Sequence, residues 1–315
     1  MSKSDIEERT PGRTEAKLQR GMFWLLCLFA AASGLSVAVM NVAMGLLVPL
    51  ALYHLWRTPP DWRGIWHIAP GVFGWLGLFV LSAFLSAVTA PELQKGMSMF
   101  GNDYIYRMLP AGIVLFWVKD KRQLKILVIC MVLSISLNNL WGIGQWLRTP
   151  FDVGMRFHGP ISFMAQGAML SALIPLLSLA TVRYMGGRWY PVLPILLAVA
   201  VVALLLNGAR GAWLATFATM IVTMALAVRN RKRYLAGLAA SLLLLGAVFT
   251  QCVPLQARLA TLAQPTYQSN SERLLMWRSA FQMFQDHPLL GVGLGHYEKA
   301  YQTRYILPEA KERTQ

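Results

Sequence analysis

Long runs of apolar residues recur along this chain from residue 21 to residue 253, with only short polar segments between them. An α-helix needs roughly 20 apolar residues to cross a bilayer core of about 30 Å. Runs close to that length stand at 68–89, 126–147, 161–182, 191–208, 212–228 and 234–253. A shorter run covers 104–118 and contains Arg107. The pattern predicts an all-α polytopic membrane protein.

The composition fits the same class. Apolar residues make up 56% of the chain and charged residues 14%, whereas a soluble domain carries about 25% charged residues. The net charge of +15 does not predict a nucleic-acid partner, because the basic residues form short clusters between apolar runs, where they set membrane topology. We therefore expect membrane lipids, and no nucleic acid, as partners.

The first apolar stretch, residues 21–53, is too long for one helix and contains Ser33 and Gly34. If it is a hairpin of two helices, most basic clusters fall on one side of the membrane: Arg9 to Arg20, Arg57 and Arg63, Lys119 to Lys125, Arg183 and Arg188, and Arg229 to Arg233. The positive-inside rule makes that side cytoplasmic. We expect about nine spans in a transmembrane domain of residues 1–253, with residues 254–315 on the outer side.

Part of the outer segment has the pattern of an amphipathic helix. Apolar residues recur there at spacings of three and four: Leu274, Leu275, Trp277, Ala280, Phe281 and Phe284. Arg273 and Arg278 lie beside them. The pattern predicts a helix that lies on the membrane.

Arg210 is the most informative single residue, because it stands between two apolar runs with almost no loop to separate them. Arginine at membrane depth is costly and usually faces a cavity or an anionic partner, and its planar fork of donors suits phosphate oxygens. The alternative is an arginine that snorkels to the interface. Arg156, in an outer loop with His158, either lines the same cavity or belongs to an ordinary solvated loop.

The C-terminal segment also contains the pattern Gly291-x-Gly293-x-Gly295. It follows no predicted strand, so it does not indicate a nucleotide-binding loop, and we expect close packing against a substrate or a helix. His287 and His296 are candidates for a general base. The chain has neither the histidine spacing of a zinc site nor an outer acidic cluster, so we expect no metal ion and no cofactor.

Asn138, Asn139 and Gln145 are polar residues inside a predicted span. Hydrogen bonds between helices are the simplest role for polar side chains at such depth. We therefore expect each of them to bond to a neighbouring helix.

Several of these features resemble the bacterial O-antigen ligase and polymerase superfamily, and within it the lipopolysaccharide O-antigen ligases. The resemblance rests on Gly208 to Trp213 between two spans, on Arg273-x-x-x-Trp277, on Pro288 to Gly295, and on a large outer segment after an odd number of spans. It implies the helical bundle of a C-type glycosyltransferase with a large periplasmic loop.

The resemblance also implies a reaction. It is the ligation of O-antigen polysaccharide from undecaprenyl diphosphate onto lipid A-core oligosaccharide, metal-independent and inverting, at the periplasmic face of the bacterial inner membrane. Arg210 and Arg273 match the arginine positions of the family best. Arg156 and Arg278 are further candidates for binding the diphosphate.

One feature of the family is missing before Gln315. The family places an essential histidine, followed by Asn or Ser, in the second half of its large outer loop, and no such pair occurs here. We therefore expect the catalytic base and further C-terminal spans to follow Gln315, and His296 and His287 are only weak substitutes.

Other functions remain open at the level of sequence. An O-antigen polymerase would use the same donor, and its arginine-to-glycine spacing occurs here between Arg148 and Gly159. A protein O-oligosaccharyltransferase would differ only in its acceptor. Outside the enzymes, a lipid-linked glycan transporter would also explain many spans, but it predicts two related halves with broken helices, and the chain lacks such symmetry.

Overall fold

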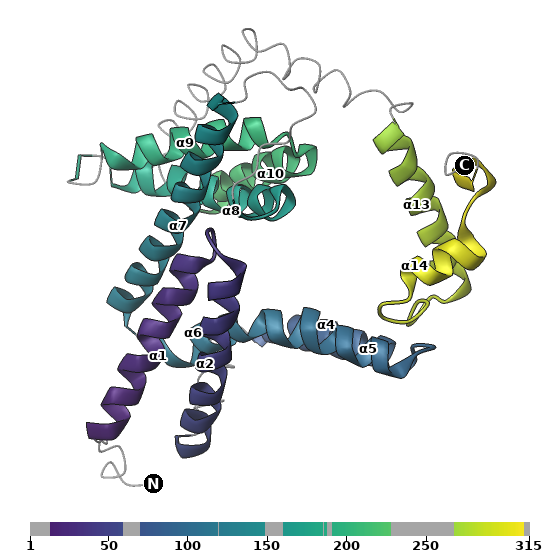
Figure 1. Ribbon diagram of the computed structural model, residues 1–315, viewed down its shortest axis with the longest axis horizontal. Coiled ribbons are helices and arrows are strands. Elements are labelled where there is room, and N and C mark those ends of the chain that lie inside the picture. Colours follow the sequence, from purple (N-terminus) through teal and green to yellow (C-terminus); the bar gives the residue numbers. More distant parts are fainter. Residues whose placement is uncertain are drawn as a thin grey trace. The chain divides into compact units, whose positions relative to one another are not determined.

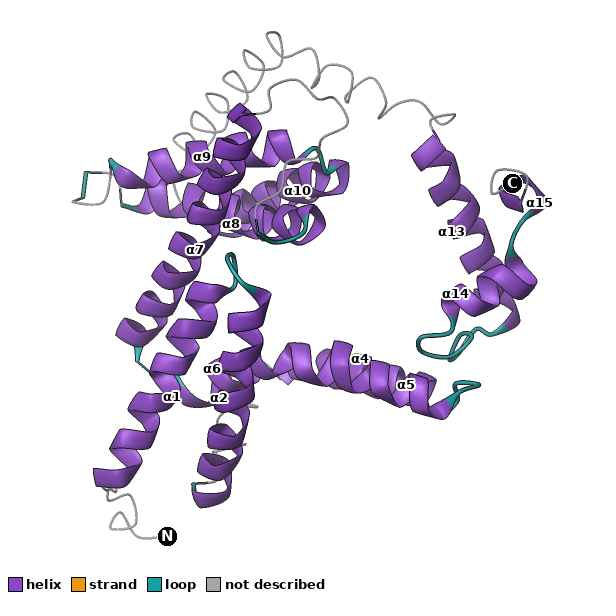
Figure 2. Ribbon diagram, in the orientation of Figure 1, coloured by secondary structure: helices purple, strands orange, loops and turns teal. Residues whose placement is uncertain are grey.

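The structure is a computed structural model, and it describes residues 13–58, 70–118, 120–148, 160–184, 186–187, 191–227 and 268–311. Every regular element in these ranges is a helix (Figure 1, Figure 2). Four of them are long and apolar enough to cross a membrane: α2 (Val37–Arg57), α4 (Pro70–Val88), α7 (Lys121–Arg148) and α8 (Phe163–Arg183). The prediction of an all-α polytopic membrane protein is confirmed.

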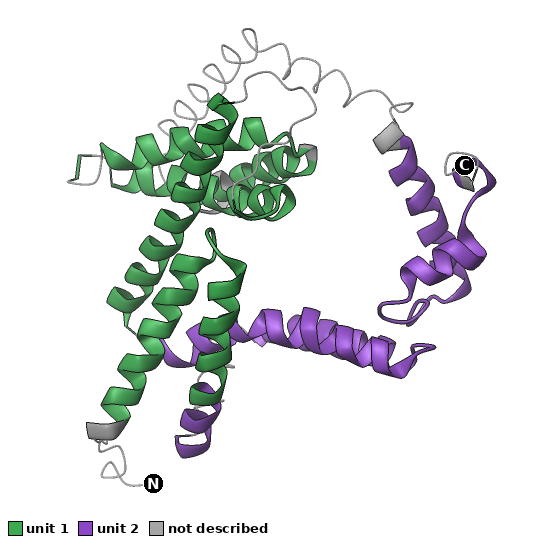
Figure 3. Ribbon diagram, viewed as in Figure 1, with its two compact units in different colours: residues 1–50, 119–263 green, residues 51–118, 264–315 purple. Residues whose placement is uncertain are grey.

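The chain divides into two compact units (Figure 3). Unit 1 consists of residues 1–50 and 119–263, and unit 2 of residues 51–118 and 264–315. Both units therefore combine an N-terminal and a later part of the chain.

Unit 1 is a bundle of hydrophobic helices. Besides α7 and α8 it contains α1 (Arg13–Ala32), α9 (Val192–Asn207) and α10 (Arg210–Ala227). Helix α8 packs against α9 and α10, and α7 packs against α1 and α9. The core is built from aliphatic side chains, namely Ile135, Leu170, Leu173, Ile174, Leu177, Ala200, Ala203, Leu204 and Met220.

The expected hairpin in residues 21–53 is present as α1 and the start of α2, with a turn between them. The turn packs closely on α7. The backbone N–H of Gly34 donates to the hydroxyl of Ser134 over 2.9 Å, and a Cβ on Gly34 would lie 2.8 Å from the Ser134 carbonyl oxygen. Glycine is required because no side chain fits between the turn and α7.

Unit 2 contains α4 and a helical run that returns along it, made of α5 (Leu93–Met99), the π-helix η2 (Phe100–Tyr106) and α6 (Arg107–Trp117). Ala83 and Ala87 of α4 pack against Phe100. The span expected at 104–118 therefore begins inside a longer helical run. Arg107 forms an ion pair with Asp103 over 2.8 Å.

The surface of α4 is the clearest sign of a lipid environment. Only Ala83 and Ala87 are buried on this helix, while large apolar side chains are exposed along the rest of it: Val72, Trp75, Leu76, Leu78, Phe79, Leu81, Phe84, Leu85 and Val88. In water, each exposed side chain of this size would forgo about 1.5–3 kcal/mol of burial free energy. A helix that is apolar on all sides belongs in a bilayer.

The C-terminal part of unit 2 contains α13 (Gln268–Asp286), α14 (Tyr297–Ala300), the π-helix η3 (Tyr301–Tyr305) and α15 (Pro308–Lys311). The amphipathic helix predicted around Leu274 to Phe284 is thus present. The expected span at 234–253 lies outside the described residues, and α9, with 16 residues, is about 24 Å long. The total of nine spans remains a prediction.

Candidate functional site

Two of the arginines predicted to bind a diphosphate, Arg273 and Arg278, lie on α13, and both are exposed. They are five positions apart, which places them about 140° apart around the helix axis. The way in which α13 is held determines what these two side chains can reach.

The inner face of α13 packs against η3. Leu275 and Met283 are buried there, and the buried Ser279 hydroxyl donates to the Tyr305 carbonyl oxygen over 2.6 Å. The Tyr305 hydroxyl donates to the Asp286 carboxylate over 2.7 Å. These contacts fix the rotation of α13, so that its other faces are turned outward.

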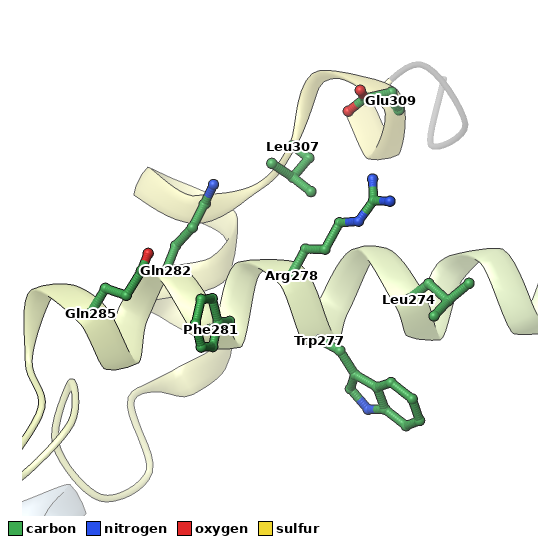
Figure 4. A pocket seen from close by; sticks show the side chains of 8 residues that line it. All are labelled: Leu274, Trp277, Arg278, Phe281, Gln282, Gln285, Leu307 and Glu309. Atoms are coloured by element: carbon green, nitrogen blue, oxygen red, sulfur yellow. The ribbon is translucent and has the colours of Figure 1, made fainter.

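An open groove of about 580 Å³ lies beside α13 (Figure 4). It is lined by Leu274, Trp277, Arg278, Phe281, Gln282 and Gln285 of α13, and by Leu307 and Glu309. In Figure 4 the Arg278 side chain extends toward Glu309, whereas Trp277 points to the opposite side of the helix. The groove joins an apolar wall to guanidinium, amide and carboxylate groups, which can bond to sugar hydroxyls and, through the guanidinium, to phosphate.

The glycine loop, Gly291 to Gly295, packs against the end of α4 and against α5. Its three glycines all have positive φ: 66° at Gly291, 92° at Gly293 and 78° at Gly295. A Cβ on Gly293 would lie 2.7 Å from the Cα of Ala90, and one on Gly295 would lie 2.8 Å from the sulfur of Met99. The prediction of close packing is confirmed for Gly293 and Gly295, whereas a Cβ on Gly291 would meet no atom within 4 Å.

Polar contacts hold the glycine loop in place. The Ser86 hydroxyl donates to the Leu290 carbonyl oxygen over 2.8 Å, and the Leu294 N–H donates to the Ser86 carbonyl oxygen over 3.1 Å. Just beyond the loop, Lys299 forms an ion pair with Glu92 over 2.7 Å. The hydrogen bond from Lys299 and its charge lower the pKa of Glu92 below the ordinary value.

The two candidate histidines have different surroundings. His287 directly follows α13 and is exposed. His296 is only 2% exposed, and its Nδ1 lies 2.9 Å from the Leu294 carbonyl oxygen, which can only accept. Nδ1 therefore donates a hydrogen bond to this oxygen, and Nε2 is buried without a partner in the described part of the chain. The burial makes His296 part of the packing under the glycine loop.

In unit 1, Arg210 is the first residue of α10, and its side chain lies outside the described part of the structure. Helix α9 ends at Asn207, followed by Gly208 with φ of 63°. The Asn207 side-chain amide donates to the carbonyl oxygen of Phe163, the first residue of α8, over 2.9 Å. The N-termini of α8 and α10 thus lie at the same end of the bundle, and helix N-termini favour anions.

Close contact between α8 and α10 sets the position of Arg210. A Cβ on Gly167 would lie 3.0 Å from the Cβ of Ala212 and 3.2 Å from the Asn207 side-chain oxygen. The first turns of the two helices therefore approach nearly to backbone contact. A larger residue at position 167 would push the start of α10 away.

A cluster of buried amides lies beside this contact. The Gln166 amide donates to the side-chain oxygen of Asn139 over 3.1 Å, and both residues are fully buried. The predicted interhelical hydrogen bond is thus confirmed for Asn139. For Asn138 the prediction is wrong, because its side-chain nitrogen and oxygen are buried without a partner among the described residues.

Comparison with known families finds a similarity in the later part of the chain. Residues 195–315 match the family model described as O-antigen ligase. Over these residues, the chain is similar to the O-antigen ligase family. The four helices that are long and apolar enough to cross a membrane indicate a multi-pass membrane protein. Searches among curated proteins and among solved structures gave no match.

The part that matches the O-antigen ligase family contains α10, α13 and the glycine loop. Four of the predicted site residues lie in unit 2, namely Arg273, Arg278, His287 and His296, while Arg210 lies in unit 1. Arg156 precedes the matched part and lies outside the described residues. Within the described ranges, the structure contains no cluster of three or more His, Cys, Asp or Glu side chains that could hold a metal ion.

Sequence reasoning predicted Arg278 but missed the other polar residues of the groove, Gln282, Gln285 and Glu309. Arg278, Gln282 and Gln285 share one side of α13 and line the groove with Glu309. Their spacing of four and three was a usable signal, because residues so spaced lie on one helix face. The contribution of Glu309 could not be predicted, since it depends on how α15 folds back beside α13.

Proposed function

We propose that this protein is a membrane glycosyltransferase that transfers O-antigen polysaccharide from undecaprenyl diphosphate onto lipid A-core oligosaccharide at the periplasmic face of the bacterial inner membrane. The observation that carries the proposal is the match of residues 195–315 to the O-antigen ligase family. That part includes both the start of α10, with Arg210, and the arginines of α13.

In the proposed reaction, a hydroxyl group of the core oligosaccharide attacks the anomeric carbon of the donor sugar. A new carbon–oxygen bond forms while the bond from that carbon to the diphosphate oxygen breaks. The hydroxyl proton passes to a base, and undecaprenyl diphosphate leaves with the bonding electrons. Attack opposite the leaving group inverts the anomeric carbon.

The arginines supply the electrostatic part of this scheme. Negative charge grows on the diphosphate as the bond breaks, and fixed guanidinium donors stabilise that charge without a metal ion. Arg210 is favoured for this role because it begins α10 beside the N-terminus of α8, where helix dipoles also favour an anion. Arg273 and Arg278, which are exposed on α13, are further candidates for binding a diphosphate.

An assay in lipid nanodiscs tests the proposal, with purified undecaprenyl-diphosphate-linked O-antigen as donor and lipid A-core as acceptor. Arg210→Ala is expected to lower the rate of transfer on the order of 100-fold, the usual cost of losing one donor to developing charge. Arg183→Ala is the matched control, because Arg183 ends α8 on the predicted cytoplasmic side. Equal rates for Arg210→Ala and wild type would remove Arg210 from the site.

The same assay separates the alternatives by acceptor. A second lipid-linked glycan replaces lipid A-core in one reaction, and a protein that offers Ser and Thr side chains replaces it in another. Exclusive transfer to the lipid-linked glycan would identify a polymerase, and exclusive transfer to protein an O-oligosaccharyltransferase. Movement of the donor across the bilayer without any transfer would identify a transporter.

A further inference from the structure

The outward face of α13 carries a row of large apolar side chains. This apolar stripe consists of Leu274, Trp277, Phe281 and Phe284, which are 44%, 68%, 60% and 57% exposed. Their spacing of three, four and three confines them to an arc of about 80° on the helix. Four such side chains in a row form a continuous apolar surface that the described part of unit 2 leaves uncovered.

The stripe is not needed to hold α13 in its unit. Leu275, Ser279 and Met283, on the opposite side of the helix, make the contacts that attach α13 to the rest of unit 2. Because those contacts fix the rotation of the helix, the stripe is presented outward as one face. The helix is amphipathic in an unusual sense, since it has two apolar faces and only one of them is packed.

The basic and the acidic residues of α13 lie on different sides of the helix. On the helical wheel, Arg273 borders one edge of the stripe and Arg278 borders the other. Neither guanidinium makes an ion pair with a carboxylate in the described part of the chain. The two acidic residues of α13, Glu272 and Asp286, fall on the opposite side of the wheel.

We propose that α13 lies in the plane of the membrane surface, with the apolar stripe inserted among the lipid chains and with Arg273 and Arg278 at the level of the lipid phosphates. Helices with a Trp- and Phe-containing apolar face flanked by arginines bind at this depth, about 5–10 Å into the boundary. Tryptophan favours the interface, and long basic side chains extend to the headgroups. The occupant of the stripe is thus the bilayer in which the hydrophobic helices of the same chain are embedded.

The position of α13 at the membrane surface does not depend on the proposed reaction. It sets the depth of the groove of Figure 4, whose Arg278 edge would open at the boundary between lipid and water. A diphosphate attached to a polyprenyl chain resides at that same boundary. In this arrangement the groove lies at the boundary between lipid and water, whatever substrate it accepts.

Site-directed spin labelling tests this position directly. Single cysteines are introduced into a variant of the full chain whose own cysteines are replaced, and the labelled protein is reconstituted in nanodiscs of phosphatidylethanolamine and phosphatidylglycerol. Trp277→Cys and Phe281→Cys report on the stripe, and Gln282→Cys and Glu272→Cys are controls on other sides of α13. All four replaced residues are exposed, so we expect each variant to fold. The measured quantity is collision of the label with oxygen, which concentrates in lipid, and with a water-soluble nickel chelate.

The expected result is an oxygen-to-nickel collision ratio several-fold higher at Trp277→Cys and Phe281→Cys than at the two controls. Two results would overturn the proposal. A low ratio with a mobile label at all four positions would mean that α13 stands in water. Low collision with both reagents, together with an immobilised label on the stripe, would mean that a second copy or another part of the chain covers it.

Discussion

Gly293 illustrates how single residues specify the glycine loop. It combines φ of 92° with a Cβ position only 2.7 Å from the Cα of Ala90. Gly293→Ala therefore adds a steric clash to the cost of a left-handed backbone, which is about 1–2 kcal/mol for a residue with a side chain. We expect the loop to detach, and amide hydrogen exchange over residues 290–299 to become at least several-fold faster.

Gly291→Ala is the matched control for this change. Gly291 also has positive φ, of 66°, but a Cβ there would meet no atom within 4 Å. The control carries the backbone cost without the clash, so its exchange should increase less. Equal acceleration in the two variants would show that contact with Ala90 does not hold the loop.

Glu92 makes the docking of the loop sensitive to acid. Lys299 lowers the pKa of the Glu92 carboxyl, so their ion pair contributes stability above the ordinary pKa range of glutamate. That contribution is lost as the pH falls through the lowered pKa. We expect hydrogen exchange around Lys299, corrected for its intrinsic pH dependence, to show a small step on acidification. Glu92→Gln should abolish the step, and a step that persists in this variant would mean that another group titrates.

At the scale of helices, hydropathy and charge predicted most of the fold. Basic clusters on one side of the membrane required a hairpin in residues 21–53, and α1 and α2 form it. The periodicity around Trp277 predicted α13, which also agrees with the structure. These features are local, because they depend on residues near one another in the sequence.

Features that join distant segments could not be predicted. Ser86 and Leu290, which are 204 positions apart, share a hydrogen bond, and no pattern in either segment identifies the other. The π-helix η2 was also missed, since hydrophobic periodicity does not reveal one additional residue in a turn. Among the groove residues, Arg278 was predicted as a candidate for binding phosphate, whereas Gln282 and Glu309 were not, because amides and carboxylates are common on any polar surface.

The crossing of α8 and α10 yields a prediction at the same scale. Gly167→Val would place methyl groups against Ala212, whose Cβ is already within 3.0 Å of the Cβ position on Gly167. The start of α10 must then shift, and a displacement of about 1 Å can cost 100-fold in rate. If Arg210 binds the donor as proposed, transfer in the nanodisc assay should fall to about that extent.

Gly144→Val provides the comparison for this effect. Gly144 lies on α7 with no atom within 4 Å of its Cβ position, so the change has the same helix propensity cost without the steric conflict. It should leave transfer close to wild type. Similar loss in both variants would point to general destabilisation rather than to the position of Arg210.

At the scale of the whole molecule, the proposed function requires a particular orientation of the chain in the membrane. The start of α10 and the segment from α13 to α15 must both face away from the cytoplasm, because lipid-linked O-antigen and lipid A-core meet there in the proposed reaction. The segment that follows α6, with Lys121 and Lys125 at the start of α7, must face the cytoplasm. This arrangement is the one expected from the positive-inside rule together with the predicted odd number of spans before residue 254.

Labelling of single cysteines in cells tests this membrane orientation most directly. Gln282→Cys and Lys125→Cys are compared in a background without native cysteines, using a maleimide that does not cross the inner membrane. Both replaced residues are exposed. We predict that Gln282→Cys reacts in intact cells whose outer membrane has been permeabilised, and that Lys125→Cys reacts only after lysis. Reaction of Lys125→Cys in intact cells, with Gln282→Cys protected until lysis, would contradict the proposed periplasmic transferase.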